Sequence, residues 1–118
     1  MNSTTPFKEL EKAEMLLDKC EPTNSAERDY DQLAALLIHE RILDSLRIKM
    51  FEENEHGSQQ ANDYLYRERL VRHRISSFAL RLDTEVTDRI TGESPEQKSV
   101  VAMCIRNRAE YPAPTPKA

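Results

Sequence analysis

Glycine is scarce in this chain: its 118 residues contain only two, Gly57 and Gly92, and tryptophan is absent. Glycine supplies the positive backbone angles of tight turns and allows a backbone to approach a phosphate closely. Its scarcity argues against phosphate-binding loops, dinucleotide-binding turns and hairpin-rich β folds. No apolar run approaches the roughly 20 residues that cross a bilayer, so we also expect no membrane-spanning segment.

Cysteine is nearly as rare. Cys20 and Cys104 lie far apart and form no Cys-x-x-Cys or Cys/His cluster. The opening residues, MNSTTPFKEL, lack the basic segment and apolar run of a secretory signal. We therefore expect reduced thiols and a cytoplasmic location. The three histidines are scattered, and HERIL at residues 39–43 lacks the second histidine of a zinc-protease motif, so we predict no metal and no cofactor.

Charged residues make up 32% of the chain and hydrophobic residues 38%, with a net charge of −4. This balance favours a thin, elongated helical packing over a thick layered core. We expect one helical domain over residues 1–110. The proline-rich end YPAPTPKA, residues 111–118, is expected to be extended or disordered.

Capping signals divide the domain into four helical segments. Thr5 and Pro6 suit the start of the first, Asn24 with Glu27 forms a capping box at the second, and Ser58 caps the third. Ser94 followed by Pro95 suits the start of the fourth. The predicted ranges are about 6–20, 25–55, 58–90 and 95–109.

The two central segments are each about 30 residues, or about 45 Å of helix. A tight turn around Gly57 separates them, so they are predicted to pair as an antiparallel hairpin. No segment alternates with the period of a strand. The predicted fold class is all-α, a long helical hairpin with two shorter flanking helices, similar to a four-helix bundle.

Apolar residues recur at helical spacing along both central segments. The predicted core face of the second is Ala35, Ile38, Ile42, Leu46 and Met50, widened by Leu36 and Leu43. Further apolar residues lie beside the two main faces, and we expect some to stay exposed in a monomer: Leu36, Leu37, Leu43, Tyr64, Tyr66, Leu70 and Leu80. An exposed apolar patch marks an interface, so a homodimer or a partner helix is expected.

Positive charge is concentrated in the third segment, where YRERLVRHRI at residues 66–75 holds four arginines and a histidine. Residues 64–82 carry five arginines and one acid, a local charge of +4, whereas residues 25–56 carry eight acids and four bases, or −4. Ion pairs between the two helices, with Glu40 or Asp44 as acceptors, are one explanation. The other is a face that binds an acidic protein, because guanidinium groups pair carboxylates in a bidentate manner.

We therefore expect a non-enzymatic protein–protein interaction module. Roles that fit are an adaptor, an assembly or secretion chaperone, or an inhibitor of the kind encoded by phages and mobile elements. The partner would be a protein, with an acidic surface as one option, contacted through the third segment. The predicted contact residues are Arg67, Arg74, Arg81, Tyr64, Tyr66 and Leu70, since arginine and tyrosine are enriched at binding hot spots.

Two alternatives use the same segment. A nucleic-acid-associated regulator would direct the arginines to phosphates and would lose affinity steeply as salt rises. In addition, RERLVRH at residues 67–73 resembles the Arg-x(4–6)-His pattern of the HEPN ribonucleases, which are all-α and place a composite active site across a dimer. That resemblance implies that Arg67 positions phosphate and His73 supports attack by the 2′-hydroxyl.

Overall fold

The computed structural model describes residues 4–53, 58–92 and 99–115, and these parts of the chain contain helices and no strands. The helices are α1 (Thr4–Lys19), α2 (Ala26–Glu53), α3 (Gln59–Leu80), α4 (Thr84–Thr91) and α5 (Val100–Arg106). The all-α prediction is confirmed. Within the described residues, no helix combines the length and apolar character needed to cross a bilayer.

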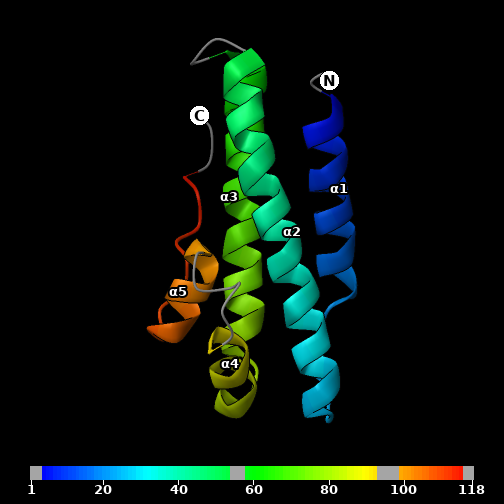
Figure 1. Ribbon diagram of the computed structural model, residues 1–118, viewed down its shortest axis with the longest axis vertical. Coiled ribbons are helices and arrows are strands. Elements are labelled where there is room, and N and C mark those ends of the chain that lie inside the picture. The colour runs from blue at the N-terminus through cyan, green and yellow to red at the C-terminus, as the bar shows by residue number, and fades with distance from the viewer. Residues whose placement is uncertain (1–3, 54–57, 93–98, 116–118) are drawn as a thin grey trace.

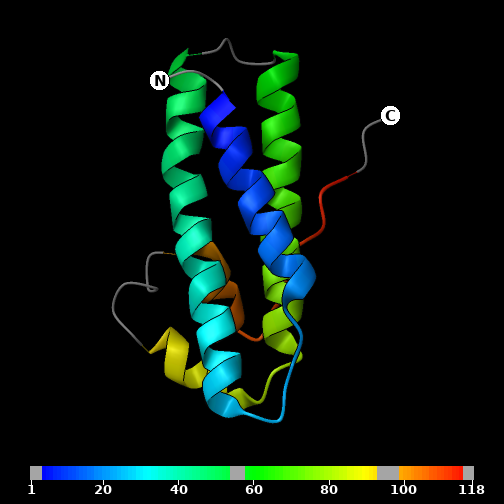
Figure 2. The same ribbon diagram turned by 90° about the vertical axis from the view of Figure 1, so that its right-hand side faces the viewer.

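The long helices α2 and α3 run side by side in opposite directions along the 43 Å axis of the molecule (Figure 1). Helix α1 crosses over the line where α2 and α3 meet (Figure 2), and α5 packs on the other side of that pair. Helix α4 contacts α2 and α5 at the lower end of the bundle. The predicted hairpin with short flanking helices is therefore present, although its turn around Gly57 lies outside the described residues.

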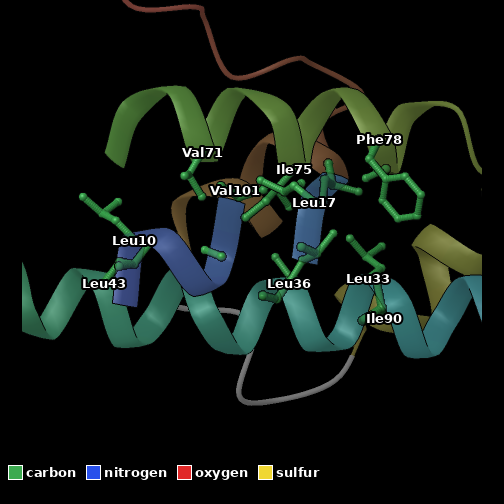
Figure 3. Close-up of a cluster of buried hydrophobic side chains, with 14 of the residues drawn as sticks. Leu10, Leu17, Leu33, Leu36, Leu43, Val71, Ile75, Phe78, Ile90 and Val101 are labelled. Atoms are coloured by element: carbon green, nitrogen blue, oxygen red, sulfur yellow. The ribbon is translucent and has the colours of Figure 1, made fainter. Parts of the chain in front are cut away.

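Leucine and isoleucine side chains from all five helices fill the core (Figure 3). The predicted core face of α2 was partly wrong: Ile38 is 52% exposed and Ile42 is 38% exposed. The buried face lies further around the helix and consists of Leu33, Leu36, Leu37, Glu40, Leu43, Leu46 and Met50, of which Leu46 and Met50 were predicted as core residues. Glu40 interrupts this apolar run in the sequence but has partners inside the bundle, so the leucines around it can be buried.

The third predicted helix does not continue to residue 90. Helix α3 ends at Leu80, and α4 begins after Asp83, whose extended backbone accepts a hydrogen bond from the Val86 N–H at 3.0 Å. Aspartate is favoured at such a helix start. The apolar spacing continues across the break, and for that reason a single helix was predicted. The break lets α4 pack on α2 and α5, where Val86 and Ile90 are buried.

The fourth predicted helix starts later than expected and ends earlier. Ser99 is its N-cap, because its Oγ accepts a hydrogen bond from the Ala102 N–H at 3.0 Å and its backbone is extended. The predicted cap at Ser94 and Pro95 lies outside the described residues. At the other end, Arg108 takes a left-handed backbone (φ 58°) and the Ala109 N–H bonds the Cys104 carbonyl, which closes the helix in a Schellman motif.

The start of α2 also differs by one residue from the prediction, since the Ser25 hydroxyl, rather than Asn24, accepts the hydrogen bond from the Arg28 N–H at 3.2 Å. The predicted cap of α3 is confirmed: Ser58 Oγ accepts from the Ala61 N–H at 3.2 Å. Serine at these starts satisfies an N–H group that has no partner within the helix.

Candidate functional site

Two of the predicted contact arginines lie against α1. Arg67 donates to both carboxylate oxygens of Glu14, at 2.5 and 3.2 Å, and its guanidinium lies 5.7 Å from the centre of the Phe7 ring. Arg74 donates to Asp18 at 2.8 Å. These contacts fix α1 on α3. The exposed Arg81 lies over the Phe78 ring at the end of α3.

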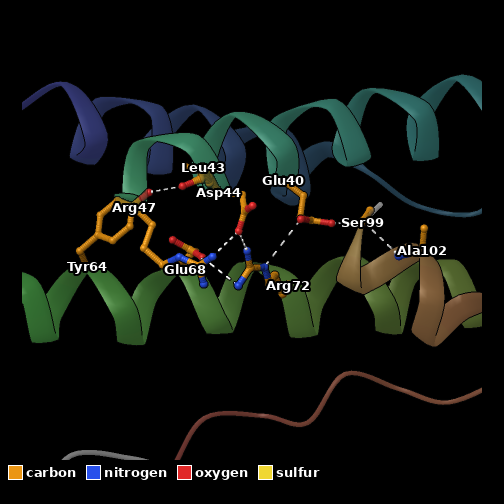
Figure 4. Close-up of polar contacts among 9 residues, drawn as sticks. All are labelled: Glu40, Leu43, Asp44, Arg47, Tyr64, Glu68, Arg72, Ser99 and Ala102. Atoms are coloured by element: carbon orange, nitrogen blue, oxygen red, sulfur yellow. Dashed lines mark hydrogen bonds and ion pairs between the residues drawn. The ribbon is translucent and has the colours of Figure 1, made fainter. Parts of the chain in front are cut away.

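Arg72 occupies the centre of a buried ionic network between α2 and α3 (Figure 4). Its guanidinium nitrogens lie 2.8 Å from Glu68, 2.9 Å from Asp44 and 3.8 Å from Glu40. Arg47 joins the network by pairing with Asp44 and lies 3.6 Å from Glu68. The predicted pairing of Glu40 and Asp44 with an arginine is confirmed.

Burial shapes the acid–base behaviour of this network, because Glu40, Glu68 and Arg72 are each at most 3% exposed. Burial raises the pKa of Glu40 and of Glu68 above the usual range, although Arg72 lowers both. Ser99 donates a hydrogen bond to Glu40 while capping α5, so the network also holds α5 in place. Glu40, Glu68 and Arg72 are inaccessible to a ligand, and we assign the network a structural role.

Several predicted surface residues are in the core. Tyr64 is fully buried and its hydroxyl donates to the Leu43 carbonyl at 2.8 Å, which removes it from any binding surface of the folded chain. Leu36, Leu37 and Leu43 are buried as well. The expectation that some of these residues stay exposed holds for Leu80, while Tyr66 and Leu70 are half-buried.

The chain after α5 has no regular secondary structure over residues 109–115, and its first part contacts α3. The Tyr111 N–H donates to Ser76 Oγ at 2.9 Å, and the Tyr111 carbonyl lies 2.8 Å from Nδ1 of His73. Glu110 accepts a hydrogen bond from Ser77. Residues 110–115 are called here the C-terminal segment; Glu110 and Tyr111 contact α3, and the residues after them extend away from it (Figure 2).

A groove of about 510 Å³ runs between the first half of α3 and the C-terminal segment. Its walls combine an aromatic ring, an aliphatic side chain, a guanidinium and two amides with a proline on the opposite side. The lining residues are Gln59, Asn62, Leu65, Tyr66, Arg69, Pro114 and Thr115. Of the predicted contact residues, the groove includes Tyr66, and it adds Arg69, which is exposed.

The two residues of the ribonuclease-like pattern point to different neighbours. Arg67 pairs with Glu14 of α1, whereas His73 contacts Tyr111 and Glu110 of the C-terminal segment. A single chain therefore does not bring them together at one phosphate. Among residues 4–53, 58–92 and 99–115, no group of three His, Cys, Asp or Glu side chains is arranged to hold a metal.

Cys20 and Cys104 are free, half-buried thiols. Burial raises the pKa of the Cys20 thiol, an effect that Arg74 only partly opposes. A raised pKa lowers the fraction of thiolate, which is the reactive form. The Cys20 side chain packs against the apolar core.

Comparison with protein-family models, curated proteins and solved structures returns no match for this chain.

Proposed function

We propose that this protein is a non-enzymatic protein–protein interaction module that binds an extended, acidic segment of another protein in the groove between α3 and the C-terminal segment. The observation that supports this proposal most is the placement of Tyr66 and Arg69 in that groove, next to Leu65 and Pro114. Tyrosine and arginine contribute strongly at protein interfaces.

The chemistry of the groove fits a peptide better than a compact ligand. The Gln59 amide nitrogen donates to Asp63 at 2.8 Å, and its amide oxygen can accept a hydrogen bond from a peptide N–H in the groove. Arg69 can pair a carboxylate through two parallel hydrogen bonds. Apolar contact with Leu65 and the Tyr66 ring supplies area for a hydrophobic side chain.

The arrangement of the arginines favours a protein partner over nucleic acid. Arg67, Arg72 and Arg74 are each paired with acids of α1 or α2, or within α3, which leaves them little capacity to bind phosphates. A nucleic-acid surface needs several such cations on one exposed side. Arg69 alone in a groove suits recognition of a single carboxylate.

The test is affinity capture from a lysate of the source organism, with the tag at the N-terminus because the C-terminal segment forms one wall of the groove. We compare the wild type with Tyr66→Ala/Arg69→Glu by quantitative mass spectrometry. The proposal predicts a protein that the wild type retains and the double variant loses. Titration of that purified protein should show at least a tenfold weaker dissociation constant for the variant.

A matched control is Arg81→Glu, which reverses an exposed arginine outside the groove. This variant should retain the captured protein. If both variants retain the same set of proteins, or if the wild type instead binds DNA or RNA at 50 mM salt, the proposed function is wrong.

A further inference from the structure

On the side that faces away from the core of the described residues, α2 carries exposed isoleucines among polar side chains. Ile38 is 52% exposed, Ile42 is 38% exposed and Ile48 is 57% exposed, and Ile38 and Ile42 are neighbours one turn apart on the helix surface. The opposite face of α2 already fills the core of the chain. Ile38 and Ile42 therefore form a small apolar patch that a partner helix could cover.

The spacing along this face is that of a coiled-coil seam. Successive residues are four and three positions apart, and each is exposed or half-buried: Asp31, Ala35, Ile38, Ile42, Ser45 and Lys49. We call these six residues the α2 seam. An alternation of four and three keeps one line of side chains facing a partner helix over about 27 Å.

The α2 seam is complementary to itself when the partner runs in the opposite direction. Reversal about position 40 places Ile38 opposite Ile42, the half-buried Ala35 opposite Ser45, and Asp31 opposite Lys49 of the second copy. The isoleucines thus meet at the centre, small residues flank them, and opposite charges meet at both ends. Asp31 borders Arg89 of its own chain, and its carboxylate can accept a second cation as well.

We propose that two copies of this chain form an antiparallel dimer through the α2 seam. A two-fold interface requires that the same surface fit itself, and the reversal symmetry of charge and size along the seam meets that requirement. A partner of unrelated sequence would not require this symmetry. The seam shares no residue with the groove on α3, so the dimer would present two grooves.

Sedimentation velocity over a concentration series from about 1 to 200 μM tests the dimer, since an interface of this modest size fits a dissociation constant on the order of micromolar. The wild type should change from monomer to dimer across the series. Ile42→Ser should weaken the dimer at least tenfold. Met15→Ser, which changes an apolar residue on α1 that is more exposed than Ile42, should leave it unchanged.

A charge reversal tests the antiparallel register. Asp31→Lys places like charges at both ends of the seam and should weaken the dimer, whereas Asp31→Lys/Lys49→Asp should restore it. Circular dichroism of each variant should match the wild type, because the changed residues are on the surface. A wild type that stays monomeric throughout, an Ile42→Ser variant that dimerises as before, or a double reversal that fails to restore pairing would each overturn the proposal.

Discussion

Arg72 shows how a single buried cation can determine the packing of this bundle. Glu40 and Glu68 approach it from α2 and α3, and both carboxyls are almost inaccessible to water. A buried carboxylate loses the stabilisation that water provides and needs a nearby cation in its place. Part of the positive charge in residues 66–75 therefore has a structural cause.

The first prediction concerns removal of this cation. Arg72→Met should lower the free energy of unfolding by about 3–5 kcal/mol at pH 7, because it leaves two buried carboxylates without their shared partner. Urea denaturation measures the change. The exposed Arg69→Met is the control, with an expected change below about 0.5 kcal/mol.

The loss should also depend on pH. Burial raises the folded-state pKa of Glu40 and Glu68 above the unfolded value of about 4.3. Below the unfolded-state pKa both carboxyls are protonated, so they carry no buried charge and do not destabilise the folded variant. As the pH rises through the folded-state pKa, the carboxyls ionise and the destabilisation by buried charge returns. The deficit of Arg72→Met should therefore be smaller at pH 4.5 than at pH 7. A deficit that is equal at both values would show that lost packing, rather than charge, is the cause.

At the scale of single elements, the end of α5 carries an arginine where glycine is usual. Arg108 has φ 58°, and its guanidinium donates to Asp88 at 2.6 Å and to Thr87 at 2.9 Å on α4. The side chain thus connects α5 to α4, while the left-handed backbone is strained for any residue with a Cβ.

Two substitutions separate these effects. Arg108→Ala and Arg108→Gly both lose the contacts with α4, but only Arg108→Ala keeps the strain. We expect Arg108→Gly to be more stable than Arg108→Ala by about 1 kcal/mol in thermal or urea unfolding. If alanine proved equal to or better than glycine, the left-handed closure of α5 would be wrong.

The sequence was sufficient to predict the all-α class and the approximate ranges of α1 and α2, although the predicted cap Thr5 lies inside α1 and Ser25 rather than Asn24 caps α2. It was misleading at residues 81–83, where an apolar pattern at Phe78, Leu82 and Val86 continues across a break in the helix. Apolar periodicity shows only which side of a helix is buried. Two consecutive helices can bury the same side, so the pattern does not show the break between α3 and α4.

The core face of α2 was mispredicted for a related reason. The buried face contains Glu40. Because charged residues are expected to be exposed, the sequence pattern assigned Ile38 and Ile42 to the core instead. Only the three-dimensional structure shows that Arg72 and Ser99 accommodate that carboxyl. The groove also depends on where the C-terminal segment lies relative to α3, which local sequence does not show. Tyr66 was predicted as a contact residue. The sequence could not show that Arg69 borders the groove while neighbouring arginines pair with acids.

On the scale of the whole molecule, the paired arginines, the exposed isoleucines and the groove lie on different parts of the surface. The paired arginines hold α1 and α2 on α3, the exposed isoleucines lie along α2, and the groove lies between α3 and the C-terminal segment. If both proposals hold, a dimer would present two identical grooves and could bind a repeated or dimeric partner with increased avidity.

The central claim is that partners bind in the groove between α3 and the C-terminal segment, and hydrogen–deuterium exchange of the complex with the captured protein tests it most directly. We predict slower exchange in peptides that cover residues 59–69 and 110–115, with α1 unchanged relative to the free protein. Slower exchange confined to α1 or α4, with the groove peptides unaffected, would contradict the account.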